Sequence, residues 1–107
     1  MTWNYQPTPK ETESYLFDGP YYVTASVDAK MSKEDVQSAI TKVLEASIDQ
    51  DGLDRIQTLI HQKSGSKVWV IDNVSEEYKD EILESSPTAQ NDLKEYDATT
   101  VMFPEDY

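Results

Sequence analysis

The chain has 107 residues, 37% of them hydrophobic, and its 21 acids outnumber nine Lys and Arg residues to give a formal net charge of −12. This length indicates one domain with one modest core. The absence of cysteine excludes disulfides, thiolate nucleophiles and cysteine-based zinc sites, and it fits a reducing compartment.

The negative charge is concentrated toward the C-terminus. Residues 1–71 hold ten acids and seven bases, whereas residues 72–107 hold eleven acids and only Lys79 and Lys94. Such a surface repels nucleic acid and anionic lipid and attracts basic partners over long distances. We therefore expect neither direct nucleic-acid binding nor membrane association. A plainer interpretation stays open, in which the acids serve solubility only.

No segment has the length of a membrane span. The longest apolar run is Val68–Ile71, far short of the roughly 20 residues that a membrane-crossing helix needs. The first residues also lack the basic and apolar regions of a secretion signal. The sequence therefore predicts a cytoplasmic location.

Residues 1–20 combine three prolines with four aromatic rings. Prolines favour irregular, extended backbone, whereas disordered tails are usually poor in aromatic residues. We predict an N-terminal arm over residues 1–20 that lies through its rings on a single α+β domain of residues 21–107, or on a partner.

A strand and a helix are predicted next. Residues 21–27 are rich in aromatic and β-branched side chains and follow Gly19-Pro20, which indicates a strand. From Ser32 to about Gln50 the apolar residues recur at helical spacing, and Ser32 suits the N-cap. Gly52 supplies a stop signal for this main helix.

Two β-rich runs follow. Residues 53–62 fit either a helix or a strand, but the loop 63–66 contains glycine and residues 67–72 are β-branched and aromatic. A hairpin is the more economical interpretation. Because the 67–72 strand is apolar on both faces, we expect it to be central, with Trp69 buried. One face needs the arm, a second copy or a partner to cover it.

The last third is predicted to hold a short helix over residues 75–84 with Tyr78 facing inward, a loop over 85–96 and a strand over 98–103 that Pro104 ends. Together these elements predict an α+β fold: a small antiparallel sheet of about four strands with one main helix packed on one face.

Several segments resemble a known family. They are Tyr22-Val23-Thr24, Val36-Gln37, Asp54-Arg55-Ile56-Gln57 and the ending Thr100-Val101-Met102-Phe103-Pro104-Glu105-Asp106-Tyr107. In this order they are similar to the small Gram-positive (Firmicutes) family catalogued as domain of unknown function 960, which is also carried on staphylococcal chromosomal cassettes. The resemblance implies a cytoplasmic bacterial protein with an α+β fold, and it assigns no functional residue.

No catalytic, metal or cofactor site is predicted. His61 is the one histidine in the sequence, and a lone histidine is usually an ordinary polar residue rather than a base or a ligand. The acidic run from Asp49 to Asp54 resembles a calcium loop, but Asp54 stands where the loop requires glycine and Ile60 where it requires an acid. The three glycines are too far apart for a phosphate loop.

The leading hypothesis is a non-enzymatic acidic binding protein, in its sharp form a DNA mimic or an inhibitor of a basic nucleic-acid-handling protein. Mobile elements are a plausible home for such an inhibitor. The candidate partner-binding residues are Asp72, Glu76, Glu77, Asp80, Glu81 and Glu84. The alternative is a structural or assembly module that forms a homodimer through the sheet face, with the acids serving solubility only. An enzyme acting on a small molecule is the third and weakest interpretation.

Overall fold

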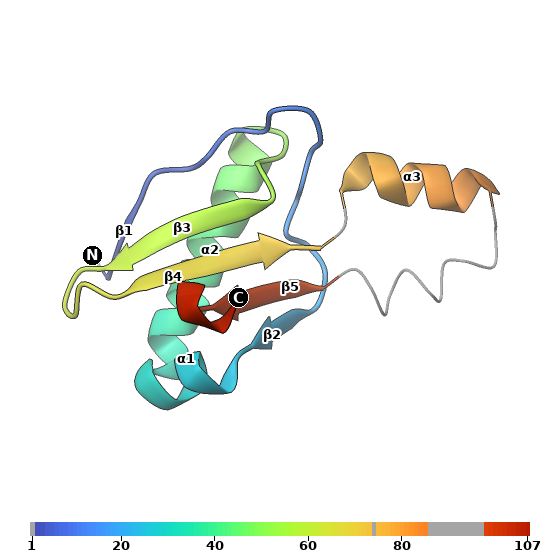
Figure 1. The fold of residues 1–107 in the computed structure, drawn as a ribbon. Helices are drawn as coiled ribbons and strands as arrows, with labels where there is room; N and C mark the ends of the chain where they lie inside the picture. Colours follow the sequence, from blue (N-terminus) through green and yellow to red (C-terminus); the bar gives the residue numbers. More distant parts are fainter. Residues whose placement is uncertain (1, 74, 86–97) are drawn as a thin grey trace.

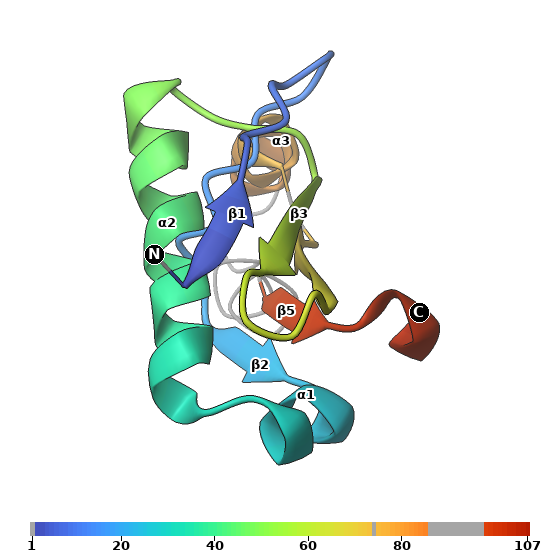
Figure 2. The ribbon, with the colours of Figure 1, turned by 90° about the vertical axis from the view of Figure 1, so that its left-hand side faces the viewer.

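The computed structural model describes residues 2–73, 75–85 and 98–107. It has an α+β fold, as predicted, in which a five-stranded sheet of order β1-β3-β4-β5-β2 packs one face on a long helix (Figures 1 and 2). In chain order the elements are β1 (Trp3–Tyr5), β2 (Tyr21–Val23), α1 (Ala25–Lys30), α2 (Lys33–Asp49), β3 (Ile56–His61), β4 (Lys67–Asp72), α3 (Glu76–Ser85), β5 (Thr99–Met102) and the 3₁₀ turn η2 (Pro104–Asp106).

The main helix is confirmed as α2. The Ser32 hydroxyl accepts a hydrogen bond from the Asp35 N–H at 3.1 Å, which caps the first turn. The apolar stripe lies buried against the sheet, with Ala39 and Val43 fully inaccessible to solvent. The chain leaves the helix through two residues with positive φ, Asp51 and then Gly52, which ends the helix at the predicted place.

The predicted hairpin is confirmed as β3 and β4. The two strands pair antiparallel with Leu59 opposite Val68 and Thr58 opposite Trp69. Alternation along β4 sends Val68 and Val70 into the core beneath α2. Trp69 points to the other face and is only partly buried, so the expectation of a buried Trp69 is wrong.

Two local predictions need correction. The strand predicted over residues 21–27 ends at Val23, because Thr24 caps a new helix, α1, by accepting from the Val27 N–H at 3.4 Å. The sheet is also mixed rather than wholly antiparallel, because β2 pairs parallel with β5 at the edge. The sequence pattern marks strands but carries no information on which neighbour an edge strand will choose.

The N-terminal arm is part of the sheet and the core. β1 pairs antiparallel with β3, with Trp3 opposite His61. The Trp3 ring is 2% exposed, and its Nε1–H donates to the Asp35 carbonyl oxygen at 2.8 Å. Phe17 is fully buried. The arm therefore packs on the helix side of the sheet. On the opposite face Ile71 is buried, whereas Ile60 and Tyr22 are exposed.

The face of the sheet away from α2 is called the open face here. By strand alternation and register it carries Asn4, Tyr22, Ile56, Thr58, Ile60, Lys67, Trp69, Ile71, Thr100 and Met102. At one corner η2 bends over it, and the Tyr107 ring lies edge-on to Trp69 with 5.9 Å between centroids. Figure 2 shows the helix α2 on one side of the sheet and η2 on the other.

Helix α3 lies beyond one end of the sheet rather than over either face (Figure 1). It confirms the helix predicted over residues 75–84. Tyr78 is 51% exposed, so the prediction that it faces inward is wrong. The loop predicted over residues 85–96 falls almost entirely outside the described residues. Within the part of the chain that is described, no helix is long and apolar enough to cross a membrane.

Burial of Trp3 predicts that the first strand contributes to the stability of the whole domain. Trp3→Ala should lower the free energy of unfolding by about 3–5 kcal/mol, as large-to-small core substitutions do. Ile48→Ala, at a position on α2 that is 78% exposed, is the control and should change it by no more than about 0.5 kcal/mol. Denaturant titration measures both. Equal effects would show that β1 does not contribute to the stability of the domain.

Candidate binding surface at the acidic end of the sheet

Three segments meet where β4 leads into α3. Residues 8–18 run beside the start of β3, where the Tyr15 N–H donates to the Leu53 carbonyl at 3.1 Å and the Leu53 N–H donates back at 2.9 Å. The Asp54 N–H donates to the Thr8 carbonyl at 3.0 Å. The same arm touches α3, because the Glu76 N–H donates to the Ser14 carbonyl at 2.9 Å.

This meeting point is called the acidic end here. The acids that it gathers with exposed side chains are Glu11, Glu13, Asp18, Asp49, Asp51, Glu77, Asp80 and Glu81. The bases among the same segments are Lys10, Arg55 and Lys79. The opposite end of the sheet is nearly balanced in charge, because its lysines offset most of its acids. The lysines are Lys30, Lys33, Lys63 and Lys67, and the acids are Asp28, Glu34, Asp35, Glu105 and Asp106. The fold therefore concentrates charge that the sequence distributes over several segments.

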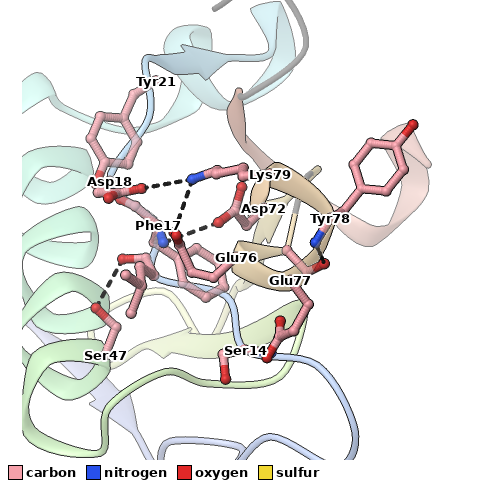
Figure 3. A network of polar contacts seen from close by, with 12 residues as sticks. Ser14, Phe17, Asp18, Tyr21, Ser47, Asp72, Glu76, Glu77, Tyr78 and Lys79 are labelled. Atoms are coloured by element: carbon pink, nitrogen blue, oxygen red, sulfur yellow. Dashed lines mark hydrogen bonds and ion pairs between the residues drawn. The ribbon is translucent and has the colours of Figure 1, made fainter. Parts of the chain in front are cut away.

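A buried carboxylate anchors the arm at this end. Asp72, the last residue of β4, is 0% exposed, and its Oδ2 accepts from the Phe17 N–H at 3.0 Å (Figure 3). Phe17 has a φ of 56°, a left-handed conformation that a non-glycine residue rarely adopts. That conformation turns its N–H toward the carboxylate while its ring fills the core.

The backbone around Phe17 is held from two further sides. The Tyr21 hydroxyl donates to the Phe17 carbonyl, and the Ser47 hydroxyl of α2 donates to the Leu16 carbonyl at 2.9 Å. Burial raises the pKa of Tyr21 to about 12, and the negative charges of Asp18 and Asp72 act in the same direction. The phenol therefore stays protonated and able to donate at every physiological pH.

The start of α3 is tied to the arm by a reciprocal pair of contacts. Buried Ser75 accepts from the Tyr78 N–H at 3.2 Å and caps the helix. The Ser14 N–H donates to the Glu77 carboxylate, at 2.9 Å to its Oε2, while the Ser14 carbonyl accepts from the Glu76 N–H. The hydrogen bond from the Ser14 backbone holds the pKa of Glu77 below its ordinary value.

Lys79 is engaged inside the acidic end. Its Nζ lies 3.0 Å from Glu76 Oε1 and 3.2 Å from Asp18 Oδ1, and its side chain is 13% exposed (Figure 3). Ion pairs whose carboxylates are partly exposed, as those of Asp18 and Glu76 are, add little stability. The ion pairs hold the charge of Lys79 between α3 and the arm. The outer side of the helix is therefore left acidic.

The predicted partner-binding residues differ from one another in their exposure and in their contacts. Asp72 is a correction: its burial and its bond to Phe17 keep this carboxylate away from any partner. Glu76 is half-buried and paired with Lys79. Glu77, Asp80 and Glu81 are exposed on α3. Glu84 belongs to α3, but its side chain lies outside the described residues.

Acids from the first half of the chain join this surface, and sequence reasoning missed them. Glu11, Glu13 and Asp18 come from the arm, and Asp49 and Asp51 from the end of α2. Residues 1–71 are nearly balanced in charge, so the net charge of that segment gave no sign of these acids. The run from Asp49 to Asp54 was visible, but only the pairing of the arm with Leu53 brings it beside α3.

A second polar cluster lies at the opposite end. His61 is 7% exposed; its Nε2 lies 3.0 Å from Asp35 Oδ2, and its Nδ1 lies 2.8 Å from Ser64 Oγ. The Ser64 N–H also lies against Nδ1, at 3.3 Å. A pocket of about 280 Å³ beside the ring is lined by Thr2, Asp35, His61 and Lys63.

The order serine, histidine, aspartate is that of a catalytic triad, but the geometry indicates a structural role. Ser64 stands three residues after His61 in the β3–β4 turn, so their contact closes that turn, and Ser64 does not line the pocket. The Asp35 contact fastens the turn to the first turn of α2. The Trp3 ring packs edge-on against His61, with 5.0 Å between centroids. Among the described residues, no group of three metal-ligating side chains converges.

Comparison with known proteins gives no match: no family model, no curated protein and no solved structure is significantly similar to this chain. The resemblance to the domain of unknown function 960 stays a prediction.

The bond between Asp72 and Phe17 can be tested by two substitutions at one position. Asp72→Ala leaves the buried Phe17 N–H without its acceptor, which should cost about 1–3 kcal/mol of stability. Asp72→Asn keeps an acceptor oxygen in nearly the same shape, so it should be the less harmful change. Denaturant titration at pH 7 compares them. If alanine is tolerated as well as asparagine, this carboxylate does not anchor the arm.

Proposed function

We propose that this protein is a non-enzymatic binding protein whose acidic end docks on a basic surface of another protein. The observation that carries the proposal is the gathering of exposed acids from the arm, the end of α2 and α3 on one end of the sheet. Solubility alone would be served equally well by acids spread over the whole surface. The concentration of one sign of charge favours the steering of an oppositely charged partner.

The internal contacts of the acidic end support the same function. The arm is held to Leu53, to Asp72 and to α3, so its acids are presented by anchored backbone. A charged surface that is already in place when a partner arrives avoids part of the ordering cost of binding. Lys79 is turned inward, which leaves Asp80 and Glu81 exposed on the outer side.

The partner class proposed is a basic protein that handles nucleic acid, with this protein acting as a DNA mimic or an inhibitor. Proteins that bind DNA present Lys and Arg to phosphates, and carboxylates in sufficient density engage the same side chains. The protein itself would not bind DNA, because its net charge of −12 repels phosphate. Action in the bacterial cytoplasm is part of this proposal, as is a link to mobile elements.

The test captures partners from a native bacterial lysate on the immobilised full chain. Captured proteins should be basic and should elute both with duplex DNA and with salt, since about 1 M salt shortens the Debye length to ~3 Å. Elution by duplex DNA is the decisive readout, because a mimic and DNA compete for one site. Capture that DNA does not displace would contradict mimicry.

A matched pair of charge-reversal variants locates the surface. Asp49→Lys, Asp80→Lys and Glu81→Lys together reverse three acids of the acidic end. The control reverses Asp28, Glu45 and Glu105 to Lys, three exposed acids that lie elsewhere on the surface. Both variants change the net charge equally. We expect the first to lose at least tenfold in affinity and the control to keep most of it. Equal losses would mean that net charge, rather than this surface, governs binding.

A further inference from the structure

The N-terminal arm is held at two points, with an exposed stretch between them. At the first point the buried Gln57 side chain holds the backbone of Thr8. Its Oε1 accepts from the Thr8 N–H at 2.9 Å, and its Nε2 donates to the Thr8 carbonyl at 3.0 Å. At the second point the Phe17 ring is fully buried. Residues 8–16, called the strap here, lead from the first point to the second, and residues 9–13 are exposed.

The strap closes on Gly52, at the end of α2. Gly52 has a φ of 106°, a conformation that residues with a side chain rarely adopt, and its N–H donates to the Ser47 carbonyl at 2.8 Å. A Cβ atom added at this position would lie 2.8 Å from the Ser14 Cβ, which is closer than such atoms pack. Glycine is therefore required for the strap to come this near to the end of α2.

Ser14 is also the residue at which the strap meets α3. Its carbonyl accepts from the Glu76 N–H, and its N–H donates to the Glu77 carboxylate (Figure 3). The next residue, Tyr15, exchanges two backbone hydrogen bonds with Leu53, which follows Gly52. Adjacent residues of the strap thus bond to α3 on one side and to the segment between α2 and β3 on the other. A displacement of one pair of bonds must therefore strain the other pair.

We infer that the strap positions α3 and that the two open as one unit, with Gly52 as the seat that keeps them closed. The role of this device rests on the proposed function, because closure is what presents the strap acids Glu11 and Glu13 together with those of α3. Hydrogen bonds near the surface, with few buried apolar contacts around them, open locally without global unfolding. A basic partner that touches both segments binds the closed form better, so closure and binding are linked.

Hydrogen exchange of backbone amides, followed by NMR on the full chain, measures this opening. Gly52→Ala pushes a Cβ atom against Ser14 and strains the backbone. Exchange should become faster by about tenfold or more at Tyr15 in the strap and at Glu76 in α3, because strain of this kind favours local opening. The amide of Val70, in the middle of β4, should keep its protection.

Two further variants separate contact with the strap from the backbone conformation of the glycine. Gly65 has a φ of 74°, and a Cβ atom added there meets nothing within 4 Å, so Gly65→Ala should not change exchange at Tyr15 or Glu76. Ser14→Gly removes the Cβ atom that Gly52→Ala would approach. The double variant should therefore recover part of the protection that Gly52→Ala loses.

Four outcomes overturn the inference: exchange in Gly52→Ala that does not rise, exchange that rises at only one of the two amides, an equal rise in Gly65→Ala, or a double variant without any recovery. If Gly52→Ala does not fold, Glu77→Ala replaces it. This exposed position supplies the acceptor of the Ser14 N–H, so its loss should speed exchange at Tyr15 and Glu76 alike, and a rise at Glu76 alone contradicts the coupling. These measurements need no partner, so their failure and the failure of partner capture are distinguishable.

Discussion

Burial of the Asp72 carboxylate is the constraint on which the acidic end depends. A carboxylate with no solvent contact is costly unless its oxygens are hydrogen-bonded, so the chain around it must supply donors. The arm supplies one by taking a left-handed conformation at Phe17, whose N–H meets Asp72 while its ring enters the core. The position of the arm beside α3 follows from this contact, and so does the presentation of the acids on both segments.

The sheet is asymmetric because the two faces of β4 meet different environments. Val68 and Val70 lie beneath α2, whereas Trp69 is partly exposed and lies edge-on to the ring of Tyr107. Both sides of this strand are apolar in sequence, as in strands that are covered on both faces. On the face away from α2 the chain buries Ile71 and leaves Trp69 partly exposed. The acidic end and the open face are thus separate surfaces with separate chemistry.

His61 has a structural role, although histidine is a residue type that often serves in catalysis or metal binding. Its two ring nitrogens join the β3–β4 turn, through Ser64, to the start of α2, through Asp35. Trp3 packs on the ring and also bonds to the Asp35 backbone. These contacts fasten the end of the sheet opposite the acidic end. Each end is therefore closed by a polar cluster that ties the N-terminal arm to elements far along the chain.

Local patterns in the sequence determined the elements that are set by contacts between residues close together in the chain. The stripe of α2 with its Ser32 cap and the β3–β4 hairpin were predictable, because spacing and turn chemistry act within a few residues. Tertiary structure alone decided the rest: the parallel pairing of β2 with β5, the insertion of Trp3 and the burial of Asp72. The acidic end belongs to this second group. Its carboxylates come from segments up to 70 residues apart, Glu11 and Glu81 among them. Charge has no periodicity that predicts such a meeting, so their assembly depends on long-range hydrogen bonds and packing that no local pattern encodes.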